Sequence, residues 1–380
     1  MTYDFIISGL GCAGFSFLYY LLDSPLNDQN VLVIDSSKKD QNDRTWCYWS
    51  PTPLDTHPNK DNPTFWNSIA LTGDKNTVSS LKNLKYYHIK SSDFYHQMLE
   101  MIADKPNIKF INDEILGVNT TAEGSFELLT ASLGSFSGKK VINSIPKLSG
   151  ELPENVLKQI FLGWKIKTKT PVFDPKHITL MDFVPNQSKN FSFFYILPYN
   201  EKEALVEYTL YDKLDVDQNE MVQILKAYIE KKFSADFEIT FEEKGSIPMS
   251  TKAFSTSTNP NWINVGTIGG CTKPSTGYTY HTIQRHSKQL VKELVNGSKK
   301  TNLSWNRPFR FKFYDNILLN IASKWPDKLP DIFQEMFSRI PGDQVLKFLN
   351  EETNFIEEVN ILRKLSFGIF IKSLLNYEQH

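Results

Sequence analysis

The sequence predicts an α/β protein in which a βαβ domain carries a β-rich insert and is followed by a helical C-terminal region. Three observations favour this class. Residues 3–35 alternate as strand, glycine turn, helix and strand, residues 160–250 are rich in strand-like runs, and residues 301–380 are mostly helical in pattern. With 380 residues and 40% hydrophobic composition, the chain is long enough for one large body or two coupled domains with a shared core.

Charge and cysteine content narrow the classes of partner. The 42 basic and 43 acidic residues leave a formal charge of −1, so no overall field attracts nucleic acid. Cys12, Cys47 and Cys271 are odd in number and far apart, so we expect a reducing compartment, no disulfide framework and no metal site. The first residues carry Asp4 and lead directly into the apolar run Phe5-Ile6-Ile7, so we expect no export signal. No run reaches the roughly 18 apolar residues of a membrane span, so any membrane contact is expected from one side only.

The first element is a βαβ unit with a glycine motif at its turn. A strand leads into Gly9-Leu10-Gly11-Cys12-Ala13-Gly14, an apolar helix follows to Leu22, and a second strand covers Val31-Leu32-Val33-Ile34-Asp35. The first glycine permits a tight turn, the second lets backbone approach a pyrophosphate, and the third lets helix and strand pack closely. Asp35, 21 residues after Gly14, is placed to accept hydrogen bonds from an adenosine ribose. The unit therefore predicts a Rossmann-like dinucleotide-binding domain.

The segment over residues 36–90 is polar and turn-rich, and we expect it to be a loop that lies over the cofactor. In this loop Arg44 would pair either with cofactor phosphate, which we favour, or with Asp43. A helix over residues 91–103 and strands between residues 108 and 144 then return the chain to the first domain.

The insert is expected to add several strands, a helix over residues 220–233 and a strand over residues 237–241. A second glycine-rich turn follows, in which Gly266-Thr267 and Pro274-Ser275-Thr276-Gly277 lead into a helix over residues 280–295. A helix N-terminus reached in this way presents backbone N–H groups to a polar part of the cofactor. Two cofactor segments so far apart in sequence indicate a flavin more than a loosely held nicotinamide.

These elements divide the chain into three parts. We expect residues 1–150 and 251–300 to form a discontinuous FAD-binding domain and residues 151–250 to form a β-rich substrate-binding domain. Residues 301–380 would form the helical C-terminal region. Its first stretch, Trp305 to Tyr314, interleaves aromatic residues with arginine and lysine. We favour the interpretation that these aromatic side chains pack inward, into the core. The second interpretation is that they anchor the protein at a lipid interface.

Glu207 is the candidate catalytic acid. It is a lone carboxylate in the apolar and aromatic run Ala204-Leu205-Val206-Glu207-Tyr208-Thr209-Leu210-Tyr211. If the whole strand is buried, the carboxyl group loses its water and its pKa rises, which stores an acid at neutral pH. If the strand alternates between core and solvent, Glu207 lies on the wet face instead. The local pattern weighs these two interpretations equally.

Taken together, the motifs resemble the bacterial lycopene β-cyclases over nearly the whole chain. The likeness rests on the N-terminal glycine motif, Asp43-Arg44-Thr45-Trp46, Phe161-Leu162-Gly163-Trp164, Met181-Asp182, Tyr195-Ile196-Leu197-Pro198, Leu205-Val206-Glu207-Tyr208-Thr209 and Pro274-Ser275-Thr276-Gly277-Tyr278. Two positions depart from related patterns. Tyr208 stands where many relatives have a second acidic residue, and Thr267 follows Gly266 where flavin hydroxylases usually have aspartate.

The resemblance implies an FAD-binding domain of the glutathione-reductase-like flavoprotein type and a non-redox cyclisation of lycopene or related acyclic carotenes to β-rings. Glu207 would donate the starting proton, reduced FAD would stabilise the carbocation, and NAD(P)H would be the reductant. Asp182 is a weaker second acid, with a purely hydrogen-bonding role of about equal weight. FAD would be held by Gly9, Gly11, Cys12, Ala13, Gly14, Asp35, Arg44, Gly266, Thr267, Pro274, Thr276 and Gly277. We expect a cytoplasmic protein bound peripherally to the inner face of the cell membrane.

The aromatic content, with 27 Phe and 16 Tyr, is in keeping with a long apolar tunnel for a hydrocarbon. Two alternatives stay open. An FAD-dependent hydroxylase or prenyl reductase would use the same cofactor architecture and apolar pocket. A carotenoid-binding protein without activity would also keep the fold.

Overall fold

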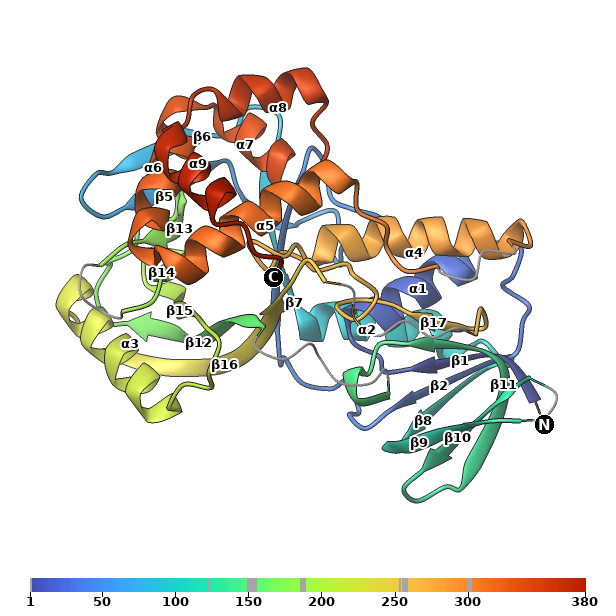
Figure 1. The fold of residues 1–380 in the computed structure, drawn as a ribbon. Coiled ribbons are helices and arrows are strands. Elements are labelled where there is room, and N and C mark those ends of the chain that lie inside the picture. Colours follow the sequence, from blue (N-terminus) through green and yellow to red (C-terminus); the bar gives the residue numbers. More distant parts are fainter. Residues whose placement is uncertain are drawn as a thin grey trace.

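The structure, a computed structural model, describes residues 2–121, 124–148, 156–184, 189–252, 254, 259–298 and 303–380. Two large sheets, one small sheet and a group of C-terminal helices make up these residues (Figure 1). The predicted α/β class is confirmed. The domain boundaries predicted at residues 150–151 and 300–301 lie outside the described residues.

The first sheet is built on the predicted βαβ unit. Strand β1 (Thr2–Ser8), helix α1 (Cys12–Leu22) and strand β2 (Val31–Asp35) follow one another along the chain. The strand order is β8-β2-β1-β11-β10-β9, with β17 paired to β11, and the pairs among β8, β2, β1, β11 and β17 are parallel. The remaining elements of this part are α2 (Ser91–Ala103), β8 (Ile108–Asn112), β9 (Ile115–Thr120), β10 (Phe126–Thr130), β11 (Ser135–Asn143), the 3₁₀ turn Pro146–Leu148, β17 (Trp262–Asn264) and α4 (Tyr280–Val295).

Helices α1, α2 and α4 pack on one face of this sheet. Phe5 and Ile7 of β1 point to that face and join the apolar side chains of the three helices in one cluster. Ile6 points to the opposite face, because successive strand residues alternate. Helix α1 is apolar nearly all round since it is buried between the sheet and α4 (Figure 1).

The segment over residues 36–90 is not the loop that its composition predicts. It forms five strands: β3 (Thr45–Ser50), β4 (Thr64–Trp66), β5 (Ser68–Thr72), β6 (Thr77–Ser80) and β7 (Lys85–Lys90). Strands β3, β7 and β4 make the small sheet, whereas β5 and β6 join the second large sheet, where Ile69 lies opposite Ile178. Pairing with distant strands outweighs the polar local pattern here. Two strands from the predicted first domain therefore complete the sheet of the insert.

The second large sheet has the strand order β16-β12-β15-β14-β13-β5-β6. Its strands from the insert are β12 (Leu157–Thr168), β13 (Ile178–Asp182), β14 (Ser192–Pro198), β15 (Glu203–Asp212) and β16 (Phe237–Met249), and helix α3 (Gln218–Phe233) crosses one face. Val206 and Tyr208 of β15 point toward α3. Leu205 and Tyr211 point the other way, into a cluster shared with the C-terminal helices.

The C-terminal region is helical, as predicted, and covers that other face of the second sheet (Figure 1). It contains α5 (Phe309–Lys324), the 3₁₀ turn Pro326–Lys328, α6 (Leu329–Arg339), α7 (Gly342–Leu349), α8 (Phe355–Leu362) and α9 (Phe367–Leu375). In the aromatic stretch at its start, Phe311 is buried and Arg310 pairs with Glu358 at 2.9 Å, so the inward interpretation describes most of it. Phe309, at 82% exposure, is the exception. Within the described residues, no helix combines the length and apolarity needed to cross a bilayer.

Candidate active site between the two sheets

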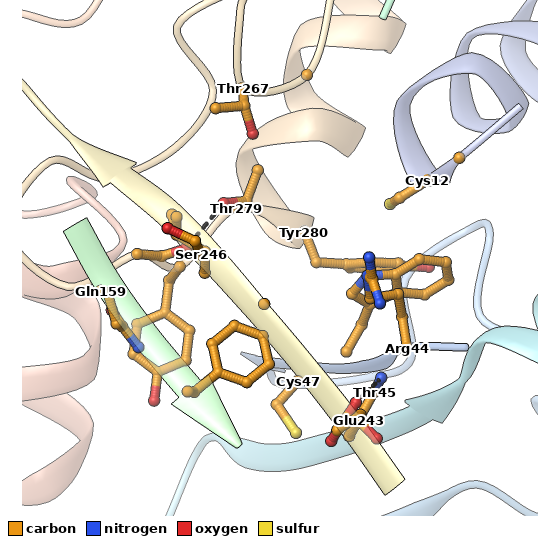
Figure 2. Close-up of a pocket in the computed structure, with 18 of the residues that line it drawn as sticks. Cys12, Arg44, Thr45, Cys47, Gln159, Glu243, Ser246, Thr267, Thr279 and Tyr280 are labelled. Atoms are coloured by element: carbon orange, nitrogen blue, oxygen red, sulfur yellow. Dashed lines mark hydrogen bonds between the residues drawn. The ribbon is translucent and has the colours of Figure 1, made fainter. Parts of the chain in front are cut away.

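A cavity of about 690 Å³ lies between the first and second sheets. On one side it is lined by the N-terminus of α1 and the second glycine turn, and on the other by strands β12, β14, β15 and β16. Figure 2 shows side chains from both sides that point into this space, among them Cys12 and Thr267 from the first and Glu243 from the second. The cavity therefore joins the predicted cofactor segments to the predicted substrate domain.

The two glycine segments, more than two hundred residues apart, meet at the cavity. Gly266 has φ +69°, and a Cβ atom there would lie 2.9 Å from the Ala13 Cβ. Gly14 lies so close to the first turn that a Cβ would be 2.0 Å from the Gly9 carbonyl oxygen. Both approaches require glycine, so the glycine spacing is set by packing as the sequence predicted.

Eight of the twelve predicted cofactor residues line the cavity: Gly11, Cys12, Ala13, Arg44, Gly266, Thr267, Thr276 and Gly277. Gly9 and Gly14 stand behind them and shape the turn. Pro274 is buried in the second turn and is not among the lining residues. Asp35 also lies outside the lining; its carboxylate accepts hydrogen bonds from the Leu10 amide at 2.6 Å and the Ser37 amide at 2.8 Å. Its predicted contact with a ribose stays a prediction.

Arg44 reaches the cavity without pairing with the carboxylate of its neighbour. Its Nη1 donates to the backbone oxygen of Asp43 at 2.8 Å. The Asp43 carboxylate instead accepts from the Ser91 hydroxyl at 2.9 Å and the Tyr95 hydroxyl at 3.0 Å. The guanidinium is exposed on the cavity wall, which fits the favoured interpretation that it meets an anionic group.

The geometry on this side fits a dinucleotide. Among the residues that the structure describes, no atom lies within 4 Å of the position that a Cβ on Gly11 would take, so a ligand can approach the backbone there. Helix α1 has no acidic residue in its first turn to compete with a phosphate for the N-terminal amides. The Thr276 hydroxyl is buried at the cavity and has no hydrogen-bond partner among the described residues.

Glu207 points into the cavity from β15, on the same face of the sheet as Leu205 and Tyr211. The alternation that suggested a solvent face is real, but the face in question borders the cavity. Burial, and then the charge of Glu243, raise the pKa of Glu207 to about 8, while a hydrogen bond from Thr209 lowers it. The Glu207 side chain is half-buried: its exposed part faces the open cavity, and the rest of it packs against protein. It is an acid that keeps its proton at neutral pH.

Glu243 is a second cavity carboxyl that the sequence analysis did not single out. It lies on β16 at 4% exposure, and burial raises its pKa to about 7 although the Thr45 amide and Arg44 oppose this. Figure 2 shows it beside Thr45, whose backbone N–H donates to its Oε2 at 2.8 Å. Glu243 was missed because the charged run Phe241-Glu242-Glu243-Lys244 is typical of a strand end in solvent. The signal available was strand alternation, which places Glu243 and Glu242 on opposite faces.

Two residues that the motifs singled out, Asp182 and Tyr208, do not line the cavity. Asp182 is not among the cavity residues; its carboxylate accepts from the Tyr228 hydroxyl at 2.6 Å and pairs with Lys232 of α3. Burial opposes ionisation there, but the hydrogen bonds from Lys232 and Tyr228 hold the pKa of Asp182 below its usual range. These contacts favour the hydrogen-bonding interpretation of Asp182, in an ion pair with α3, and its role as a second acid stays a prediction. Tyr208 also faces α3, so an acid at that position would point away from Glu207.

A cluster of aromatic hydroxyls stands next to Glu207 in the cavity wall. The Tyr86 hydroxyl contacts the hydroxyls of Tyr195 at 2.9 Å and Tyr278 at 3.0 Å, and Tyr195 donates to the Cys47 sulfur at 3.3 Å. Tyr278 lies edge-on to Trp49 with 4.5 Å between ring centroids. Burial raises the pKa values of these phenols, so they remain neutral. This part of the cavity wall thus offers aromatic rings and uncharged hydroxyl groups.

Several solved structures share this fold. They include a geranylgeranyl bacteriochlorophyll reductase-like protein from Thermoplasma acidophilum, with a TM-score of 0.58 and 14% identity over 99% of this chain and 96% of that one. The flavin-dependent brominase Bmp2 has a TM-score of 0.59 and 12% identity over 92% and 94% of the two chains. The p-nitrophenol 4-monooxygenase PnpA from Pseudomonas putida DLL-E4 has a TM-score of 0.55 and 10% identity over 100% and 99%. Identities this low show the fold alone, which is the predicted flavoprotein type.

The sequence itself places the chain more narrowly. A family model described as lycopene cyclase protein matches residues 4–375, nearly the whole length. The chain therefore belongs to the lycopene cyclase family, and the resemblance seen in its motifs is confirmed. Comparison with the curated proteins gave no match.

Proposed function

We propose that the protein is a lycopene β-cyclase, which converts the acyclic ends of lycopene into β-rings, giving γ-carotene and β-carotene, with no net oxidation or reduction. The observation that carries the proposal is the neutral carboxyl of Glu207 in an aromatic cavity. A carbon-carbon double bond is a very weak base and has no polar handle. Its protonation needs an acid that is still protonated at neutral pH and is not surrounded by water.

The residues around Glu207 suit this task. Thr209 donates to Oε1 of the carboxyl at 2.6 Å, which leaves Oε2 to carry the proton. Transfer of that proton to the terminal double bond leaves a tertiary carbocation. Attack by a neighbouring double bond closes the ring and moves the charge into it, and loss of a proton from the adjacent carbon forms the β-ring. The faces of Tyr86, Tyr195 and Tyr278 would stabilise the cation by cation-π attraction.

FAD is the cofactor we propose for the glycine side of the cavity. The amides at the start of α1, Arg44, Thr267 and Thr276 would hold it. When bound and reduced, the flavin would supply a negative charge that stabilises the carbocation, with NAD(P)H as its reductant. The likeness to flavin-dependent enzymes supports the fold of this side, and the open backbone at Gly11 supports the contact.

We also propose that the C-terminal helices bring the protein to the inner face of the cell membrane, where a hydrocarbon substrate would be dissolved. Apolar side chains of α8 and α9 are exposed, including Ile356 at 72% and Leu375 at 82%. Sedimentation with lipid vesicles measures this contact. Replacement of Ile356 and Leu375 by serine should reduce the bound fraction, and unchanged binding would remove the proposed surface.

Expression in lycopene-accumulating bacteria tests the reaction. The wild-type chain should produce cyclic carotenes with the mass of lycopene, and Glu207→Gln should leave lycopene unchanged. Glu203→Gln is the matched control. Glu203 lies on the same strand but is not among the cavity residues, and its carboxylate pairs with Lys165 at a distance of 3.5 Å. A product with added oxygen would support a hydroxylase and added hydrogen a prenyl reductase. Unchanged lycopene with the wild type would favour a carotenoid-binding protein.

A further inference from the structure

Glu207 and Glu243 face each other across a glycine. Gly163 of β12 lies opposite Glu207 of β15 on one side and opposite Glu243 of β16 on the other. The three residues form one row across the sheet, and paired residues in a row point to the same face. The two glutamate backbones are two strand spacings apart, roughly 10 Å. The middle residue, glycine, adds no side chain of its own, and the Leu205 Cδ1 also borders this space, 3.4 Å from where a Cβ on Gly163 would lie.

The space over Gly163 is shaped by both glutamates. A Cβ built on Gly163 would lie 3.4 Å from the Cβ of Glu207 and 3.4 Å from the Cγ of Glu243. Both side chains therefore border the same gap and both line the cavity. The charge of Glu243 is one of the causes that raise the pKa of Glu207, which is a second sign that the carboxyl groups are close.

One oxygen of Glu243 is held and the other is free. Oε2 accepts the Thr45 amide, whereas Oε1 is buried with no hydrogen-bond partner among the described residues. A buried carboxylate oxygen without a donor is rare in folded proteins and costs stability. Such an atom is an acceptor held ready for a proton.

The other ionisable groups near Glu243 do not provide that proton. In the loop before β3, Arg44 lowers the pKa of Glu243 and Asp43 raises it. The uncharged side chains of Cys47 on β3 and Tyr199, just after β14, also lie near Glu243. The remaining neighbour is Glu207 on β15. Burial raises the pKa values of Cys47 and Tyr199, so both keep their protons at neutral pH. Of two coupled carboxyl groups, the one with the lower pKa loses its proton first, so it is the one that is ionised and free to accept a proton.

We propose that Glu243 is the catalytic base that removes the last proton from the ring and returns it to Glu207. This assignment rests on the proposed cyclase function. In the first step the O–H bond of Glu207 breaks and a C–H bond forms on the substrate. After ring closure a ring C–H bond breaks, its electron pair becomes the ring double bond, and the proton forms an O–H bond on Glu243. Transfer from Glu243 to the carboxylate of Glu207 across Gly163 restores the starting state, so no oxidant, reductant or other co-reactant is consumed.

The pH dependence of cyclisation by the flavin-loaded enzyme tests the base. Wild type should show a bell-shaped profile, because the rate needs Glu243 ionised and Glu207 protonated. Glu243→Gln keeps an oxygen for the Thr45 amide, so flavin content and melting temperature should be retained. Its kcat should fall about 100-fold, the acid limb should vanish, and the remaining alkaline limb should move to lower pH. Glu242→Gln, whose side chain bonds to Trp164 at 2.9 Å on the other face, should keep the wild-type profile.

Two further measurements separate the possible failures. Glu243→Asp retains a carboxylate and should recover part of the rate with both limbs present, even if the glutamine variant does not fold. Infrared spectra of the carboxyl groups, taken without substrate, should show the titration of Glu207 moving to lower pH in Glu243→Gln. A wild-type rate and profile in Glu243→Gln, or a single limb in Glu243→Asp, would overturn the assignment of the base. If the wild type leaves lycopene unchanged, the proposed function fails and the base assignment fails with it, whereas the infrared shift would still report the coupling.

Discussion

The Thr209 hydroxyl donates a 2.6 Å hydrogen bond to Oε1 of Glu207, two residues away on the same face of β15. The contact has two opposing effects. It fixes the direction of the carboxyl group, and it lowers a pKa that burial and the Glu243 charge raise. An acid that is oriented in this way has one defined oxygen from which a proton can leave.

Replacement of Thr209 by valine should therefore weaken catalysis and shift its pH range in a known direction. Without the hydrogen bond the pKa of Glu207 rises further, so the alkaline limb of the rate profile should move to higher pH. Loss of orientation should lower kcat about fivefold, which corresponds to one hydrogen bond of about 1 kcal/mol. Thr209→Ser keeps the hydroxyl and should resemble wild type. An alkaline limb that stays in place or moves to lower pH in the valine variant contradicts this role of Thr209.

Folding stability should report the same carboxyl group. In the folded state the pKa of Glu207 is raised to about 8 from its ordinary value of 4.5. The stability that this group contributes is thus fully present below pH 4.5 and is lost as the pH rises through about 8. At pH 8 Glu207→Gln should therefore be more stable than wild type by on the order of 2 kcal/mol.

Thermal unfolding of the two proteins at several pH values checks this expectation. The difference in melting temperature should shrink steadily as the pH falls toward 4.5. Glu203→Gln, on the same strand but in a surface ion pair with Lys165, should show no comparable trend. A constant difference between wild type and Glu207→Gln would mean that the carboxyl is solvated.

The sequence predicted most elements of the first domain, and it predicted Glu207 but not Glu243. The βαβ unit, the helix over residues 91–103 and the helix over residues 280–295 agree with the structure because each has a strong local period and clear ends. The strands within residues 36–90 could not be predicted, since their polar local pattern does not show that β3 pairs with β7 at the other end of the segment or that β5 pairs with β13 of the insert. Glu243 was missed for the same reason: the register of β16 against β12 places it opposite Gly163, and register is not readable from one strand.

A buried network of charges joins the second glycine turn to the C-terminal helices. Lys273 pairs with Asp315 at 2.8 Å and with Glu351 at 3.3 Å, and Asp315 also accepts the Ser275 hydroxyl at 2.5 Å. Lys273 and Asp315 have side chains that are 6% and 2% exposed. Because Ser275 and Thr276 are neighbours, the network also sets the position of a residue in the cavity wall.

Asp315→Asn should therefore lose both stability and cofactor affinity. Removal of the Asp315 charge leaves Glu351 to pair with both Lys273 and Arg307, so one buried positive charge is uncompensated, which costs about 3–5 kcal/mol. Chemical denaturation measures the stability, and flavin absorbance after gel filtration measures the affinity. Asp215→Asn removes a surface partner of Lys158 that is 90% exposed, and its stability should stay within about 0.5 kcal/mol of wild type. If Asp315→Asn and Asp215→Asn have the same stability and flavin affinity, the buried network does not stabilise the protein or its cofactor site.

The approach of Gly266 to Ala13 leads to the last prediction, because it brings the two cofactor segments together. A Cβ on Gly266 would lie 2.9 Å from the Ala13 Cβ, and its φ of +69° is unfavourable for alanine. Gly297 has a similar φ of +63°, but among the described residues no atom lies within 4 Å of where its Cβ would be, so it is the matched control. Gly297→Ala should lose about 1 kcal/mol of stability and bind flavin normally. Gly266→Ala should lose a similar amount of stability through its backbone conformation, and its methyl group should also push the second turn away from α1. Its flavin affinity should therefore fall at least about tenfold in a fluorescence titration. Normal flavin binding by Gly266→Ala would show that the two segments need not meet for the cofactor to be held.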